Sequence, residues 1–118
     1  MHIEQFRAFC LNKKGVTECF PFDEDVLVFK VLNKMFALTS LSSTVFKMSL
    51  KCNPDKAILL REEFESITPA FHMNKKHWNT IQVPLLMDDK LIMDLINHSY
   101  NLVVKGMAKK DREILKGM

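Results

Sequence analysis

Apolar and polar residues alternate through the segment VLVFKVLNKMFALTS, and this pattern predicts a β-hairpin. We expect Asn33 and Lys34 to form a two-residue turn, because asparagine tolerates the positive φ of a type I′ turn. With this turn Val31 lies opposite Phe36, and most of the large apolar side chains share one face of the sheet. The predicted core face of the hairpin consists of Leu27, Phe29, Val31, Phe36 and Leu38.

Three further segments extend the predicted sheet. The run TVFKMSLK continues the alternation as a third strand. The runs ITPAFHM and HWNTIQV predict a second hairpin, with residues 74–76 at its tip. The core-facing residues predicted in these segments are Phe46, Met48, Leu50, Ile67, Phe71, Ile81 and Val83.

Three helices are predicted from apolar residues at helical spacing. The first spans residues 3–12, with Gly15 as its C-terminal cap. The second starts with Asn53 as N-cap and Pro54 at the first helical position. The third follows Asp88 as N-cap and has the strongest apolar stripe in the chain. The buried positions expected on the last two helices are Ala57, Leu60, Phe64, Leu91, Ile92, Leu95, Ile96, Ser99, Leu102 and Val103.

These elements predict a single α+β domain over residues 1–118, in the order α-β-β-β-α-β-β-α. A chain of 118 residues with 47% hydrophobic residues is sufficient for one core. We expect two layers, a mainly antiparallel five-stranded sheet with the three helices on one face. The tail KKDREILKGM is expected to extend the last helix or to fray from it.

Composition favours a soluble protein of the cytoplasm. The chain has three cysteines, Cys10, Cys19 and Cys52. Because their number is odd and no two of them form a C-x-x-C motif, we expect reduced thiols. The N-terminus lacks the apolar stretch of a secretory signal, and no apolar run is long enough to cross a membrane. The net charge of +3 and the pI near 8.8 are mildly basic, so any role for positive charge depends on where the lysines lie.

The segment HMNKKHWNTIQV invites a metal or catalytic interpretation, which its spacing does not favour. His72 and His77 flank a hairpin tip that sends their rings apart, and no neighbouring Asp, Glu or Cys completes a ligand set. Ordinary turn and strand histidines are therefore the preferred interpretation. The cysteines lie among apolar or loop residues, and phosphate-loop and zinc-protease motifs do not occur. We expect neither a cofactor nor an enzymatic activity.

The face of the sheet opposite the core carries most of the candidate binding residues. Alternation places Lys30, Lys47 and Lys51 on this open face, while Lys34, Lys75 and Lys76 lie at the two hairpin tips. Trp78 belongs by parity to the open face, although a bulge in the turn would return its ring to the core. Lysines beside an exposed aromatic ring suit a nucleic acid. Two alternatives remain open: the lysines protect sheet edges, or a protein partner covers Val26, Val28 and Val45.

Four segments, ECFPFDEDVLVFKVLNKMFAL, LKCNPD, HMNKKHWNTI and SYNLV, resemble the MmcQ/YjbR family of small bacterial proteins. The resemblance extends from about Gly15 to Arg112 and is most specific over residues 74–78. It implies a secretion-chaperone-like or frataxin-like fold, with two projecting hairpins described as a double wing and a proposed DNA-binding role. Residues 33–36 correspond to one wing, with Asn33 where the family has glycine. The other wing comprises Asn74, Lys75, Lys76, His77 and Trp78.

The leading hypothesis is thus a non-enzymatic module that binds double-stranded DNA through two basic hairpin wings. Its candidate contacts are Lys30, Lys34, Lys47, Lys51, Asn74, Lys75, Lys76, His77 and Trp78. The alternative is a module that uses the open sheet face to bind a protein partner or a second copy of itself.

Overall fold

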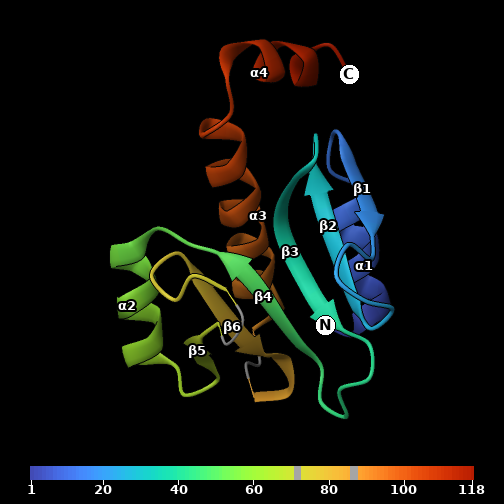
Figure 1. Cartoon of the computed structure of the whole chain (residues 1–118). Helices are drawn as coiled ribbons and strands as arrows, with labels where there is room; N and C mark the ends of the chain where they lie inside the picture. Colours follow the sequence, from blue (N-terminus) through green and yellow to red (C-terminus); the bar gives the residue numbers. More distant parts are fainter. Residues whose placement is uncertain (71–72, 86–87) are drawn as a thin grey trace.

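The computed structural model describes residues 1–70, 73–85 and 88–118. Four α-helices and a short 3-10 helix accompany a six-stranded sheet of order β1-β2-β3-β4-β6-β5, and every neighbouring pair of strands is antiparallel. The strands lie in front of α1 and α3 in Figure 1. The elements are α1 (Ile3–Leu11), β1 (Val16–Cys19), β2 (Val26–Val31), β3 (Lys34–Ser40), β4 (Lys47–Lys51), α2 (Pro54–Glu63), β5 (Ile67–Pro69), β6 (Trp78–Gln82), η1 (Val83–Leu85), α3 (Asp89–Lys105) and α4 (Lys109–Lys116).

The sheet contains one strand more than the sequence predicted. Strand β1 pairs with β2 through Val16 opposite Val31 and Cys19 opposite Val28. It has only four residues and ends just before Pro21, so its alternation is too short to give a clear pattern. The second hairpin is shorter than predicted, since β5 stops at Pro69. The prediction that Phe71 faces the core lies outside the described residues.

The first hairpin turns one residue earlier than predicted. Val31 pairs with Lys34, so Leu32 and Asn33 are the turn residues, with φ angles of 44° and 70°. Both values lie in the left-handed region that a type I′ turn requires. The register then shifts between Phe29 and Lys30, as in a β-bulge.

This bulge changes which residues of β3 face the core. The shift leaves Phe36 without a partner and sets Ala37 opposite Phe29. Phe36 and Ala37 are both buried in the core, and the side chain of Leu38 lines the opposite face of the sheet. The prediction that Leu38 faces the core was therefore wrong, because simple alternation does not anticipate an inserted residue.

One core joins the helices to one face of the sheet. The ring of Phe6 from α1 contacts Phe29 edge-on at 5.3 Å and Phe46 at 5.5 Å. Ala57 from α2 and Leu95 from α3 belong to the same cluster. The prediction that all three principal helices pack on one face is confirmed. Other strand residues in this core are Leu27, Val31, Met48, Leu50, Ile67 and Ile81, with Val83 from η1.

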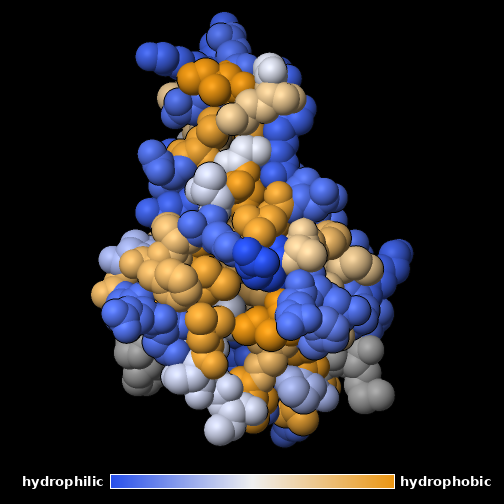
Figure 2. Space-filling model, turned by 90° about the vertical axis from the view of Figure 1, so that its right-hand side faces the viewer, coloured by the Kyte–Doolittle hydropathy of each residue, from blue (hydrophilic) through white to orange (hydrophobic). Residues whose placement is uncertain are grey.

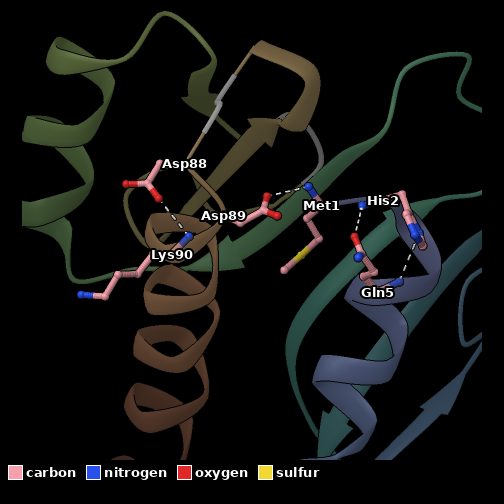
Figure 3. A network of polar contacts seen from close by, with 6 residues as sticks. All are labelled: Met1, His2, Gln5, Asp88, Asp89 and Lys90. Carbon is pink, nitrogen blue, oxygen red and sulfur yellow. Dashed lines mark hydrogen bonds and ion pairs between the residues drawn. The ribbon is translucent and has the colours of Figure 1, made fainter.

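Side-chain caps fix the starts of the helices. Figure 3 shows His2 and Gln5 in a reciprocal capping box at α1, and Asp88 accepting the backbone N–H of Lys90 at α3. The amino group of Met1 contacts Asp89 at 2.5 Å, which joins the starts of α1 and α3. Asn53 caps α2, as predicted. The expectation for Gly15 was wrong, because α1 already ends at Asn12.

The C-terminal part differs from its prediction in two respects. The buried stripe of α3 consists of Ile92, Leu95, Ile96, Ser99 and Val103, whereas Leu91 and Leu102 are only half-buried at its margins. The tail forms the separate helix α4, whose Leu115 packs so closely that a Cβ at Gly15 would lie 2.5 Å from it. Across the described ranges no helix combines the length and the apolar character needed to cross a membrane.

Candidate functional site

Both predicted hairpin tips lie at the same end of the sheet. Strand β4 is antiparallel to β3 and to β6, so the start of β3, the end of β4 and the start of β6 coincide. The β2–β3 turn and the segment before β6 therefore belong to the same end of the strands, which we call the tip end; in Figure 1 the turn lies at the top of the view and the segment before β6 lies lower, beside α2. Two strand spacings, roughly 10 Å, separate β3 from β6 only where the strands are paired, because the β3–β4 ladder ends at Ala37–Leu50, before the β2–β3 turn.

The second tip is held in place from α2. The guanidinium of Arg61 donates to the carbonyl of Lys75 at 3.1 Å and to Oδ1 of Asn79 at 2.9 Å. Within the tip, Oδ1 of Asn74 accepts the backbone N–H of Lys76 at 2.9 Å. These bonds use the backbone and leave the side chains of Lys75 and Lys76 exposed to solvent.

His77 and Trp78 link the second tip to the end of β4. The carbonyl of His77 accepts the backbone N–H of Cys52 at 2.8 Å, which joins the tip to the end of β4. Trp78 pairs with Lys51, so parity places it on the open face, as predicted. Its side chain is nevertheless only 7% exposed. The ring is therefore not a freely accessible stacking platform.

Ser99 connects the two halves of the tip end. Its hydroxyl accepts the backbone N–H of Lys51 at 2.9 Å and donates to the carbonyl of Phe36 at 2.5 Å. Strands β3 and β4 pair directly only through Ala37–Leu50 and Leu38–Ser49, so this hydroxyl continues the connection where the direct ladder stops. In the sequence, Ser99 stands out as a polar residue inside the apolar stripe of α3. The sequence alone does not reveal that its hydroxyl bonds to Lys51 and Phe36.

His98 forms a neighbouring contact between α3 and α2. Its Nε2 accepts the backbone N–H of Asn53 at 3.2 Å, next to the start of α2. Burial, together with the positive charge of Lys56, lowers the pKa of His98 below its usual value. The ring is thus held in the neutral form, which is the form able to accept this hydrogen bond.

Charge is divided between the two ends of the sheet. The end opposite the tips, which we call the far end, carries Asp23, Glu24, Asp88 and Asp89, with Lys47 and Lys90 as its exposed lysines. The described residues form two ion pairs, Met1–Asp89 and Arg7–Glu18, and neither involves a lysine. Exposed lysines at the tip end and on the adjoining helices are Lys14, Lys34, Lys56, Lys75, Lys76, Lys105, Lys109, Lys110 and Lys116.

The predicted contact residues therefore do not all lie on one surface. Lys34, Lys75, Lys76 and Asn74 come together as exposed residues of the tip end. Lys30 and Lys51 are half-buried on the open face near this end, as their pairing with Met35 and Trp78 places them. Lys47 pairs with Gln82 and lies toward the far end. It lies at the opposite end of β4 from Lys51.

The described residues provide no support for a metal site or for a reactive thiol. The described part of the chain contains no group of three His, Cys, Asp or Glu side chains arranged to hold a metal ion. The metal hypothesis also involved His72, which lies outside the described residues. Burial raises the pKa of the Cys10 thiol to about 12 and also raises the pKa of Cys52. Both thiols thus remain protonated, and a thiol is a weak nucleophile compared with a thiolate.

Comparison with known proteins shows the family. The model of the YjbR family matches residues 11–102. The chain belongs to the YjbR family. YbdF of Escherichia coli O157:H7, an uncharacterized protein, is 39% identical over 110 residues, which cover 93% of this chain and 90% of YbdF. The uncharacterized protein YjbR of E. coli K12 is 29% identical over 115 residues, 98% of each chain.

Solved structures of other bacterial proteins have the same YjbR-family fold. The crystal structure of DR2400 from Deinococcus radiodurans matches with a TM-score of 0.89 and 38% identity, over 97% of this chain and 87% of that one. A crystal structure from Pseudomonas syringae matches with a TM-score of 0.74 and 28% identity, over 86% of this chain and 98% of that one. Helix α4 lies beyond the segment that the family model covers.

Proposed function

We propose that this YjbR-family chain is a non-enzymatic module that binds double-stranded DNA through the tip end of its sheet. The observation that carries the proposal is the position of Lys34, Lys75 and Lys76 on two loops at one end of the sheet. Their side chains are exposed and form no ion pair among the described residues. Phosphate contacts of this kind supply sequence-independent affinity and orientation.

Two separate loops at one end of the sheet suit a duplex, because each loop carries exposed lysines that contact a different stretch of the phosphate backbone. Arg61 assists indirectly, because its bond to the carbonyl of Lys75 keeps the second loop in place before DNA arrives.

The unequal charge of the two ends orients the molecule relative to DNA. A net charge of +3 is too small to attract DNA strongly by itself. Exposed lysines outnumber carboxylates at the tip end and on the neighbouring α4, where Asp55, Asp111 and Glu113 also lie, while Asp23, Glu24, Asp88 and Asp89 lie at the far end. A polyanion is therefore attracted to the tip end and repelled from the far end.

The structure leads us to narrow the proposed contacts. Lys34, Lys75 and Lys76 are the primary phosphate contacts, and Lys51 is a nearby half-buried candidate for a fourth. His77 and Trp78 hold the second tip, and Asn74 shapes its turn. Direct stacking of Trp78 on bases is not part of the proposal, because its ring is largely covered.

The test is a titration of duplex DNA at several salt concentrations. Four phosphate contacts give a slope of log K against log salt near roughly −3.6, by the rule of about 0.9 per phosphate. The double variant Lys75→Ala/Lys76→Ala is expected to flatten the slope by about two units and to weaken binding similarly for unrelated sequences. The matched control is Lys47→Ala/Lys90→Ala, which removes the same charge from the far end.

Comparing the two variants distinguishes binding at the tips from attraction by the net charge of the whole protein. If the control changes the slope as much as the tip variant does, binding depends on net charge and the tips are not the site. An unchanged slope in the tip variant rejects the proposed surface. Both variants replace exposed side chains, so their stability is expected to stay within about 0.5 kcal/mol of the wild type.

The second candidate is association with a protein through the edge of the sheet that carries β1. Phe20 and Phe22, in the loop after β1, are 48% and 60% exposed, and Leu41 nearby is 47% exposed. Figure 2, which views this side, shows hydrophobic side chains at the surface between hydrophilic ones. Exposed apolar clusters of this kind mark interaction sites. A dimer in light scattering, together with no duplex binding at about 50 mM salt, would favour this function.

A further inference from the structure

A groove of about 470 Å³ crosses the open face of the sheet, away from the core and from the tip lysines. Its floor comes from neighbouring strands: Leu38, Ser49 and Thr80 lie side by side in the observed register, and Val26 pairs with Ser40 farther along β2 and β3. The volume falls within the range of about 300–1,000 Å³ that is usual for small-molecule sites. The lining residues are Phe22, Asp23, Val26, Leu38, Thr39, Ser40, Lys47, Ser49, Met73 and Thr80.

Most acceptors in the groove are already engaged within the protein. Oδ1 of Asp23 accepts the backbone N–H groups of Asp25 and Val26, at 2.8 and 2.9 Å. The hydroxyl of Ser40 donates to Asp25 at 2.5 Å, and the hydroxyl of Thr39 donates to the carbonyl of Lys47 at 2.6 Å. These hydrogen bonds hold the wall of the groove in place, and the atoms that form them are not available to a ligand.

Apart from the second carboxylate oxygen of Asp23, the polar groups still available in the groove are two hydroxyls and one ammonium, which can donate hydrogen bonds. The hydroxyls of Ser49 and Thr80 are 2.8 Å apart, so one donates to the other and the second O–H remains available. The ammonium of Lys47 forms no hydrogen bond or ion pair with the described residues. Lys47 and Ser49 are two positions apart in β4, with Met48 between them, so both side chains emerge on the same face of the sheet.

The remaining lining is apolar. Val26, Leu38 and Met73 cover the floor and one side, and Phe22 stands at the rim with 60% of its surface exposed. A single ammonium suits a singly charged anion, and the carboxylate of Asp23 at the rim disfavours groups with more negative charge. We propose that this groove binds a small apolar carboxylate, whose anionic group meets Lys47 and the Ser49–Thr80 pair while its hydrocarbon part lies on Val26, Leu38 and Met73.

This site is independent of DNA binding. Lys47 lies toward the far end, and the proposed phosphate contacts lie on the tips. The bulge at Phe36 makes the groove, because it turns Leu38 to the open face. A failure of either proposal therefore leaves the other intact.

The experiment compares octanoate, 1-octanol and octylamine by calorimetric titration of the full chain. We expect octanoate to bind with a Kd below about 1 mM and at least about tenfold more tightly than octanol, with octylamine weakest. Tenfold corresponds to about 1.4 kcal/mol, a modest value for hydrogen bonds to a charged group. Lys47→Gln is expected to remove this preference for the acid and to leave octanol binding unchanged.

Two further variants test the location. Ser49→Ala/Thr80→Val removes the hydroxyl pair and is expected to weaken octanoate several-fold, with its folding checked by thermal unfolding. Lys34→Gln, a lysine outside the groove, is the matched control and is expected to bind octanoate as the wild type does. Equal binding of acid and alcohol, no binding of octanoate at 1 mM, or equal effects of Lys34→Gln and Lys47→Gln would each overturn the proposal.

Discussion

Replacing Ser99 by alanine is expected to loosen the junction between β3 and β4. The hydroxyl makes two hydrogen bonds, to the backbone N–H of Lys51 and to the carbonyl of Phe36, and the serine itself is fully buried. Alanine removes both bonds and leaves no group that can replace them. Since α3 lies directly behind this junction, the two backbone groups lose their partner inside the protein.

The magnitude follows from these two groups. The buried carbonyl of Phe36 loses its partner at a cost of about 1–3 kcal/mol, and the part-buried N–H of Lys51 adds about 1 kcal/mol. The better helix propensity of alanine returns roughly 0.5 kcal/mol. We therefore expect Ser99→Ala to lower the free energy of unfolding by about 1.5–3.5 kcal/mol.

Urea unfolding and amide hydrogen exchange measure the effect. The exchange of the Lys51 amide is expected to accelerate in the variant, because its hydrogen bond is gone. Ser43→Ala is the control, since its exposed hydroxyl donates only to the carbonyl of Val45. A loss below about 0.5 kcal/mol, as for an ordinary surface change, combined with unchanged exchange at Lys51, would refute this reasoning.

Two more predictions concern α3. Leu95→Ala is expected to cost about 2–5 kcal/mol in urea unfolding, and clearly more than Leu102→Ala, because Leu95 is 4% exposed while Leu102 lies half-buried at the margin; equal losses would show that the stripe is misassigned. The lowered pKa of His98 means that its neutral form stabilises the fold above the unfolded pKa of about 6.5, and this stability is lost as the pH falls through the folded pKa. His98→Gln should therefore reduce the decline of stability between about pH 7 and pH 5; an unchanged pH profile would contradict the assignment.

Alternation in the sequence was sufficient to identify most of the sheet. The faces of Phe29, Met48 and Ile81 follow from the pleat alone, and these three side chains are buried as predicted. The turn was misplaced because turn preferences favour asparagine in the first position, whereas here Leu32 takes that position with φ 44°. Leu32 is an unusual turn residue, so local preference alone selects the neighbouring pair.

The candidate site was predictable only in part. The tip lysines and the N-caps Asn53 and Asp88 were recognisable because each depends on a few adjacent residues. The contacts of Arg61 with Lys75 and of Ser99 with Phe36 join residues that are far apart in the chain, and one sequence does not reveal such pairs. The bulge at Phe36 was also hidden, and with it the groove that contains Leu38.

The slope of duplex affinity against salt, compared between the wild type and Lys75→Ala/Lys76→Ala, is the most direct test of the proposed function. We predict a slope near roughly −3.6 for the wild type and about two units less for the variant, while Lys47→Ala/Lys90→Ala retains more of the wild-type slope than the tip variant does. Wild-type protein that fails to bind duplex DNA at about 50 mM salt, or a tip variant with the wild-type slope, would contradict DNA binding through the two hairpin tips.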